Sequence, residues 1–160
     1  MSENDQELFN LAMSDESRPL MYAVKKHIDE NVAPITEEFF ALNEDKEDRW
    51  TWHPRQMELL DGAKAKAKES GLWNFFLPDD ETGQGLNNLD YAYIAAELGK
   101  YALASESLNC SAPDTGNMEV LERVGTPEQK DKWLTPLLNG EIRSAYAMTE
   151  PGVASSDAKN

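Results

Sequence analysis

Apolar residues recur at helical spacing near the start of the chain. Between Arg18 and Leu42 the steps from one to the next are three or four positions, the period of one face of an α-helix. This stripe comprises Leu20, Val24, Ile28, Val32, Ile35, Phe39 and Leu42. Pro34 lies inside the pattern, and because proline lacks a backbone donor we expect it to kink or divide the helix. The spacing predicts an amphipathic helix over residues 18–42.

Helix start and stop signals divide the next part of the chain. Pro54 suits a first helical turn and Gly71 suits a helix end, so a second helix is expected between them. Its apolar stripe comprises Met57, Leu60, Ala63 (or Lys64) and Ala67. A third helix is expected from Asn88, a favoured N-cap residue, to about Gly99. Its stripe comprises Leu89, Tyr93, Ala96 and Leu98.

Residues 102–141 carry further helix signals. Small residues over 102–111 favour a buried helix, and another is expected from Pro113 to Gly125. The order Thr126-Pro127-Glu128-Gln129 is typical of a capping box, in which the Thr and Gln side chains satisfy backbone N–H groups at a helix start. We expect that last helix to stop at Asn139-Gly140.

The pattern changes after residue 141. Residues 142–148 form a short stretch that runs into Glu150-Pro151-Gly152, which predicts a β-strand and a turn. The fold class is therefore all-α: five or six helices over 18–141, followed over 142–160 by the first strand of a further part of the fold. Residues 1–17 are polar and acidic, and we expect a flexible lead.

Charge narrows the range of partners. The chain has 30 Asp and Glu against 15 Lys and Arg, a formal net charge of −15. Such a surface repels phosphate backbones and anionic membranes, so nucleic acid is not an expected partner. No apolar run reaches the ~18 residues of a membrane span, and the acidic N-terminus does not look like a targeting leader. With one cysteine and no leader, a cytoplasmic location is expected.

Familiar catalytic and metal-binding signatures are missing from the sequence. There is no GxGxxG fingerprint, no P-loop and no Cys or His cluster, so no metal site is predicted. His27 and His53 each lack a partner in sequence and favour structural roles. Cys110 has no neighbouring His, and the pair Gly83 and Gly85 favours a plain turn.

The segment from Tyr146 to Asp157 is the most informative part of the chain. It reads Tyr-Ala-Met-Thr-Glu-Pro-Gly-Val-Ala-Ser-Ser-Asp, a turn followed by small residues with free hydroxyls. Small residues let a ligand approach the backbone, and exposed N–H groups and hydroxyls can bind a polar heterocycle edge or a phosphate. On chemistry alone, an ordinary polar loop remains the simpler interpretation.

The order of motifs resembles the acyl-CoA dehydrogenase family over about residues 18–160. Met148-Thr149-Glu150-Pro151 is similar to that family's flavin-contacting signature. The stretch from Gly125 to Lys130 resembles its "G-(T/S)-x-x-Q-K" helix start. Leu77-Pro78 and the following glycines resemble its Gly-rich loop. The Ala154-Ser155-Ser156-Asp157 form resembles the branch of family members 10 and 11.

The resemblance implies an FAD enzyme that oxidises an acyl-CoA to the 2-enoyl-CoA. A carboxylate base removes the α-proton and the β-hydride goes to the flavin. Tyr146, Met148 and Thr149 would line the flavin ring, with the Thr149 hydroxyl and nearby N–H groups at its pyrimidine edge. Ser155 and Ser156 would flank the flavin, with Ser156 contacting the acyl-CoA. Glu150 would shape the turn.

The resemblance also implies that residues 142–160 are the truncated start of the family's middle β domain, and that this chain by itself is an incomplete catalyst. The family's catalytic carboxylate lies in a C-terminal domain that has no matching position here, so no catalytic residue is assigned. Complete relatives form homo-oligomers and generally pass electrons to an electron-transferring flavoprotein. The alternative hypothesis is a non-catalytic helical binding or assembly module that retains the family fold.

Overall fold

The computed structural model describes residues 11–43, 48, 50–153, 157 and 159, and it divides into two compact units. The first is Met1–Ser111 and the second is Ala112–Asn160. Among the described residues the helices join into six continuous segments, over 18–41, 54–69, 88–98, 104–107, 114–124 and 127–139. The prediction of an all-α chain with five or six helices is confirmed.

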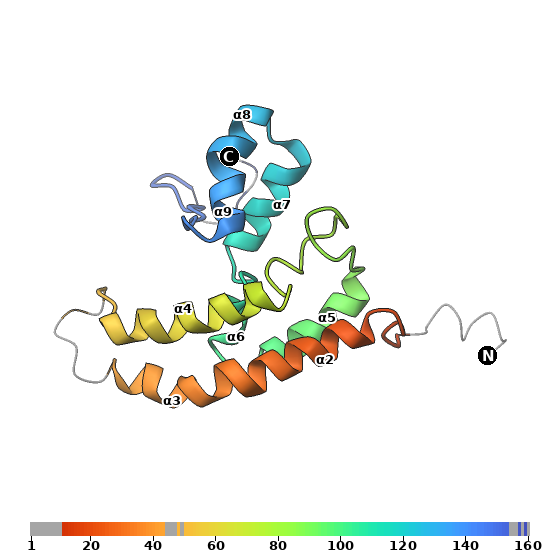
Figure 1. The fold of residues 1–160 in the computed structure, drawn as a ribbon. Helices are drawn as coiled ribbons and strands as arrows, with labels where there is room; N and C mark the ends of the chain where they lie inside the picture. The colour runs from red at the N-terminus through yellow and green to blue at the C-terminus, as the bar shows by residue number, and fades with distance from the viewer. Residues whose placement is uncertain (1–10, 44–47, 49, 154–156, 158, 160) are drawn as a thin grey trace. The chain divides into compact units, whose positions relative to one another are not determined.

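The first unit is built on one long helical segment (Figure 1). Helix α2, the π-helical turn η1 and helix α3 follow one another without a break, and α4, α5 and α6 pack around them. Helix α4 lies against α3 and η1, α5 against α2, and α6 against α4 and η1. The bounds are α2 Arg18–His27, η1 Ile28–Val32, α3 Ala33–Ala41, α4 Pro54–Glu69, α5 Asn88–Leu98 and α6 Ala104–Ser107.

Pro34 is accommodated by the π-helical turn that precedes it. In η1 the Ala33 N–H donates to the Ile28 carbonyl, five residues back instead of four. A proline ring in a regular helix clashes with the carbonyl four residues earlier, and the wider turn relieves this crowding. The helix is therefore widened at this point and continues, whereas the sequence predicted a kink or a division.

The apolar stripe of the long helix is confirmed. Val24, Ile28, Val32 and Phe39 are all buried. Burying a side chain of this size contributes about 1.5–3 kcal/mol to the hydrophobic free energy of folding.

The buried faces of α4 and α5 differ in part from the predicted ones. In α4, Met57 is exposed and Gln56 is buried in its place, where its amide donates to the Phe39 carbonyl at 2.8 Å. In α5 the predicted Tyr93 is exposed, and the buried positions are Asp90, Ile94 and Leu98. Both shifts place a polar side chain on the core face, which a count of apolar spacing cannot identify.

Asp90 holds the residues that precede α2. Its carboxylate accepts hydrogen bonds from the Ser14 N–H at 2.8 Å, the Ser14 hydroxyl at 2.7 Å, the Ser17 hydroxyl at 2.9 Å and the Asn87 amide at 2.9 Å. Met13 is buried beside this cluster. Residues 11–17, expected to belong to a flexible lead, thus make defined contacts, and residues 1–10 lie outside the described part. Asn87 caps α5, one residue earlier than expected.

The second unit contains α7, α8, η2 and α9, bounded as Asp114–Val124, Pro127–Gln129, Lys130–Leu134 and Thr135–Asn139. The capping box is confirmed, because the Thr126 hydroxyl accepts from the Gln129 N–H and the Gln129 side chain accepts from the Thr126 N–H. A π-helical turn again precedes a proline, here Pro136. The same backbone solution thus occurs in both units.

The β-strand predicted over residues 142–148 is not formed. Within the described residues this stretch has no strand pairing, and the following turn has one isolated bridge between Glu150 and Val153. A strand needs the backbone of a neighbouring strand as its hydrogen-bond partner, and a short stretch before a turn does not supply one. Residues 142–149 are therefore non-helical chain without a sheet.

Gly83 provides a test of the loop between α4 and α5. A Cβ at this position would overlap the Leu77 carbonyl, so we expect Gly83→Ala to destabilise the protein by about 1–3 kcal/mol. Gly62 in α4 has open space around it, and Gly62→Ala is expected to stabilise by about 0.5–1 kcal/mol. Urea unfolding followed by circular dichroism measures both. Equal effects of the two substitutions would contradict the close approach at Gly83.

The Asp90 cluster predicts a pH-dependent contribution to stability. The Ser14 N–H is the main cause of a lowered pKa at Asp90; burial opposes it, and the two serine hydroxyls and the Asn87 amide lower it further. Because the folded-state pKa lies below the ordinary value of about 3.9, the stabilisation is complete above that value and is lost as the pH falls below it. We expect Asp90→Asn to lower the free energy of unfolding at pH 7 by about 1–3 kcal/mol, and the melting temperature with it. Below pH 3.5 the substitution should lower the melting temperature by less.

The exposed Asp61 of α4 is the matched control for this measurement. Asp61→Asn makes the same chemical change without removing a buried acceptor, so its melting temperature should follow the wild type at each pH. If the difference between Asp90→Asn and the wild type were the same at pH 7 and pH 3, the ionised carboxylate would not be its source.

Candidate functional site

The residues predicted to contact a flavin lie after the last helix of the second unit. Tyr146 is 68% exposed, Met148 is 50% exposed and Thr149 is also exposed. Ser155 and Ser156, predicted to flank the flavin and the acyl-CoA, lie outside the described residues. The structure therefore presents three of the five predicted side chains on one short, open stretch of chain.

A buried carboxylate holds the start of this stretch. Asp114, the first residue of α7, is 2% exposed. Its Oδ1 accepts from the Ser144 N–H at 2.8 Å and from the Ser144 hydroxyl at 2.5 Å. Its Oδ2 accepts from Arg143 Nε at 2.5 Å, and the Asn117 amide donates to the Ser144 hydroxyl at 2.8 Å. We call Asp114, Asn117, Arg143 and Ser144 the Asp114 cluster.

The Asp114 cluster keeps the carboxylate ionised. Burial by itself raises the pKa of Asp114, but the two hydrogen bonds from Ser144, the hydrogen bond from Arg143 and the positive charge of Arg143 together lower it below its usual value. A buried carboxylate that lost these partners would be costly, because removing one side of a buried charged pair leaves the other uncompensated.

An apolar groove adjoins the Asp114 cluster in the second unit. Its volume is about 470 Å³ and its floor and walls come from α7, η2, α9 and the chain that follows them. The lining residues are Asn117, Val120, Leu121, Trp133, Leu137, Ile142, Arg143, Ser144 and Ala145. Apart from its polar end at Asn117, Arg143 and Ser144, the lining is hydrocarbon and indole, which suits an apolar occupant.

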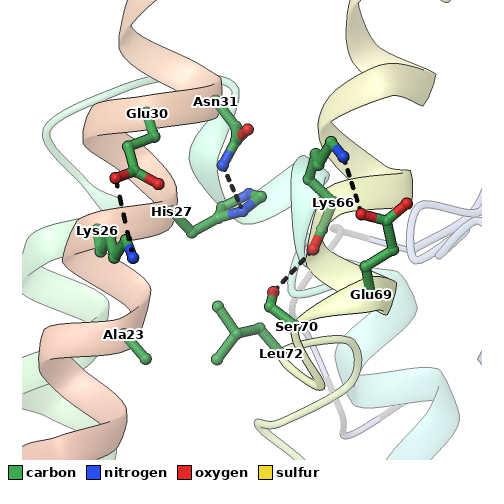
Figure 2. Close-up of a pocket in the computed structure, with 9 residues that line it drawn as sticks. All are labelled: Ala23, Lys26, His27, Glu30, Asn31, Lys66, Glu69, Ser70 and Leu72. Atoms are coloured by element: carbon green, nitrogen blue, oxygen red, sulfur yellow. Dashed lines mark hydrogen bonds and ion pairs between the residues drawn. The ribbon is translucent and has the colours of Figure 1, made fainter.

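A larger groove of about 640 Å³ lies in the first unit (Figure 2). One wall is formed by α2 and η1 and the other by the end of α4 and the residues after it. An ion pair lies on each wall, Lys26 with Glu30 at 4.0 Å and Lys66 with Glu69 at 2.8 Å. None of the predicted flavin-contacting residues lines it.

His27 lines this groove as a neutral, hydrogen-bonded side chain. The Ser107 hydroxyl donates to the Ala104 carbonyl at 2.8 Å, which leaves its oxygen to accept from His27 Nε2 at 3.0 Å. With the proton assigned to Nε2, His27 Nδ1 accepts from the Asn31 amide at 3.4 Å. Burial lowers the pKa of His27, which agrees with this assignment. Its position supports the predicted structural role.

The remaining titratable candidates also have structural positions. His53 caps α4, where its Nδ1 accepts from the Arg55 N–H at 3.0 Å. Burial raises the pKa of the Cys110 thiol far above its ordinary value, so the reactive thiolate is not populated at neutral pH. In the part of the chain that the structure describes, no three His, Cys, Asp or Glu side chains gather as metal ligands would.

Sequence reasoning did not find the Asp114 cluster. The sequence predicts a helix start at Pro113, and the spacing of the 30 acidic residues does not distinguish Asp114 from the others. Asp114 and Ser144 lie 30 positions apart, so the packing of the second unit alone brings them together. An Asp directly after a proline carries no local signal that distinguishes a buried acceptor from a solvent-facing helix start.

The chain is similar to known proteins in sequence and in structure. The family model described as "Acyl-CoA dehydrogenase, N-terminal domain" matches residues 14–141. Acyl-CoA dehydrogenase family member 10 of Mus musculus is 47% identical over 153 residues, which cover 92% of this chain and 14% of that protein. Acyl-CoA dehydrogenase family member 11 of Homo sapiens is 49% identical over 137 residues, which cover 86% of this chain and 16% of that protein.

A solved structure from Mycobacterium abscessus, described as an acyl-CoA dehydrogenase, matches with a TM-score of 0.83 and 47% identity. The match covers 92% of this chain and 37% of that one. The chain thus spans between about one seventh and somewhat over one third of the relatives compared.

The resemblance predicted from the motifs, including that to the branch of members 10 and 11, is confirmed by these matches. The match over residues 14–141 covers most of the chain and the helices α2 to α9 of its described part. The chain belongs to the acyl-CoA dehydrogenase family and corresponds to the family's N-terminal helical domain.

Proposed function

We propose that this chain provides the N-terminal domain of an FAD-dependent acyl-CoA dehydrogenase, which oxidises acyl-CoA to 2-enoyl-CoA. One observation carries the proposal: the helical domain of the family is followed directly by a Tyr-Ala-Met-Thr segment whose start is held by a buried carboxylate. When bound, FAD would supply the acceptor for the hydride that leaves the acyl chain.

The residues at hand fit one side of a flavin. Thr149 and its neighbours in the chain are exposed, and its hydroxyl, with backbone N–H groups of this stretch, suits a polar pyrimidine edge. Tyr146 and Met148 offer polarisable apolar surface for the ring. Ser155 and Ser156 complete the proposed set, with Ser156 toward the acyl-CoA. Neither groove described above includes Tyr146, Met148 or Thr149, so further walls must come from outside these residues.

Other parts of the proposal follow from the family. The substrate is an acyl-CoA and the electron acceptor an electron-transferring flavoprotein, with the complete enzyme a homo-oligomer in the cytoplasm. The base that removes the α-proton lies outside this chain. Among the described residues, no helix is long and apolar enough to cross a bilayer.

A second candidate function is a non-catalytic assembly module with the same fold. It is favoured by apolar side chains that the second unit leaves uncovered. Val120 is 59% exposed, Val124 76% and Trp133 47%. Exposed apolar surface of this kind often marks a protein–protein contact.

Retention of flavin by the 160-residue chain tests the proposal. The chain is incubated with FAD, freed of unbound flavin by gel filtration and examined by visible absorption. A retained flavin band would mean that the segment from Tyr146 to Thr149 forms a site without further walls. In that case Thr149→Val should weaken FAD affinity by about twofold to tenfold, because one hydrogen bond is worth about 0.5–1.5 kcal/mol. Thr135→Val, at an exposed position in α9, is the matched control and should bind as the wild type.

A colourless wild-type protein would refute a flavin site in this chain alone. The same gel-filtration profile reports the oligomeric state. A colourless chain that elutes as a stable oligomer would favour the assembly module, whereas equal affinities for Thr149→Val and Thr135→Val would remove Thr149 from the proposed site.

A further inference from the structure

We propose that Asp114 is a positioning residue: through Ser144, its carboxylate sets the place at which the segment from Tyr146 to Thr149 leaves the helical domain. The inference rests on the proposed function, because the segment from Tyr146 to Thr149 is the proposed flavin contact. The contacts that carry it belong to the second unit alone.

The Asp114 cluster holds Ser144 by its backbone and by its side chain together. The N–H and the hydroxyl of Ser144 both donate to Asp114 Oδ1, and the hydroxyl also accepts from Asn117. One hydrogen bond leaves a residue free to rotate about it, whereas three bonds at two separate atoms define both position and direction. Ser144 is therefore a fixed point in a stretch of chain that has no sheet to hold it.

Arg143 has a different part in the cluster. Its side chain is 53% exposed while that of Asp114 is 3% exposed, and it binds Oδ2, the oxygen that Ser144 leaves free. The guanidinium supplies a counter-charge to a carboxylate that burial would otherwise penalise. Arg143 thus keeps the acceptor charged, and Ser144 is the residue that the acceptor locates.

Chain geometry limits how far this control extends. Tyr146 follows Ser144 by two positions, so it lies within about 7 Å along the chain, whereas Thr149, five positions on, can reach about 17 Å. Ala145 to Thr149 are all exposed, so packing within the described residues adds little restraint. The cluster should accordingly order the region near Tyr146 most strongly, and Thr149 least.

A simple helix cap does not account for these contacts. Asp114 is at the start of α7, where a carboxylate is generally favourable. However, α7 has no side-chain cap hydrogen bond, and both Asp114 oxygens bind the chain that follows α9. Among the described residues, the donors to this carboxylate are Arg143 and Ser144, directly before the segment.

Backbone ¹⁵N relaxation of the 160-residue chain tests the positioning role without any flavin. In the wild type we expect order parameters near 0.85 at Ala145 and Tyr146 that decrease toward Thr149. In Asp114→Asn those at Ala145 and Tyr146 should fall below about 0.6, while residues 118–123 of α7 stay rigid. Ser144→Ala, which keeps the N–H and loses the hydroxyl, should show a smaller fall and guards against failure of Asp114→Asn to fold.

Asp131→Asn is the matched control, because Asp131 is an exposed acid in η2 of the same unit. Its order parameters should equal those of the wild type. Unchanged values at Ala145 and Tyr146 in both Asp114→Asn and Ser144→Ala would overturn the inference. So would an equal loss of order in α7, which would show that Asp114 only stabilises the unit.

FAD binding separates this inference from the proposed function. If the wild type takes up FAD, Asp114→Asn should bind at least tenfold more weakly, with a shifted visible band for any flavin retained. If Asp114→Asn bound FAD with wild-type affinity although its segment from Tyr146 to Thr149 had become mobile, the positioning role of Asp114 would be overturned. If the wild type takes up no FAD, the flavin site of this chain fails, and the relaxation data alone decide whether the cluster positions the segment.

Discussion

A carboxylate withdrawn from water has to be given hydrogen-bond donors, and this requirement organises both units of the protein. Asp90 is buried on α5 and collects donors from the residues before α2; Asp114 is buried on α7 and collects donors from the residues after α9. In each unit a helix thus binds a piece of irregular chain through a buried carboxylate. Hydrophobic packing is non-directional, so these carboxylates, like the buried Gln56 amide and the His27–Ser107 pair, add positional specificity to it.

Each unit also contains a continuous helical segment with a proline inside it. Pro34 and Pro136 each follow a π-helical turn, so each helical segment continues where a regular α-helix would be obstructed. In the second unit this continuous segment, from 127 to 139, ends four positions before Arg143, the first of the two residues bound by Asp114. The apolar groove beside the Asp114 cluster is lined by the same continuous segment.

The described part of the chain provides only one side of the proposed flavin site. Tyr146, Met148 and Thr149 present suitable chemistry, but they are exposed and have no opposing wall among the described residues. An electrostatic site is effective when its donors are preorganised, and in the proposed function the Asp114 cluster is the part of this chain that would supply this preorganisation. Both the complete enzyme and an assembly module are compatible with uncovered apolar side chains on α7 and η2.

The sequence by itself determined the helical class, the capped helix start at Thr126, the stripe from Val24 to Phe39 and the family. These features depend on residues close together in the chain, where periodicity and capping chemistry carry the information. Tertiary structure alone decided that Asp90, Gln56 and Asp114 are buried, because each has a partner that is distant in sequence: Ser14, Phe39 and Ser144 lie 76, 17 and 30 positions away. It also decided that residues 142–148 form no strand, since strand formation depends on a partner backbone, which the sequence of the stretch itself cannot provide.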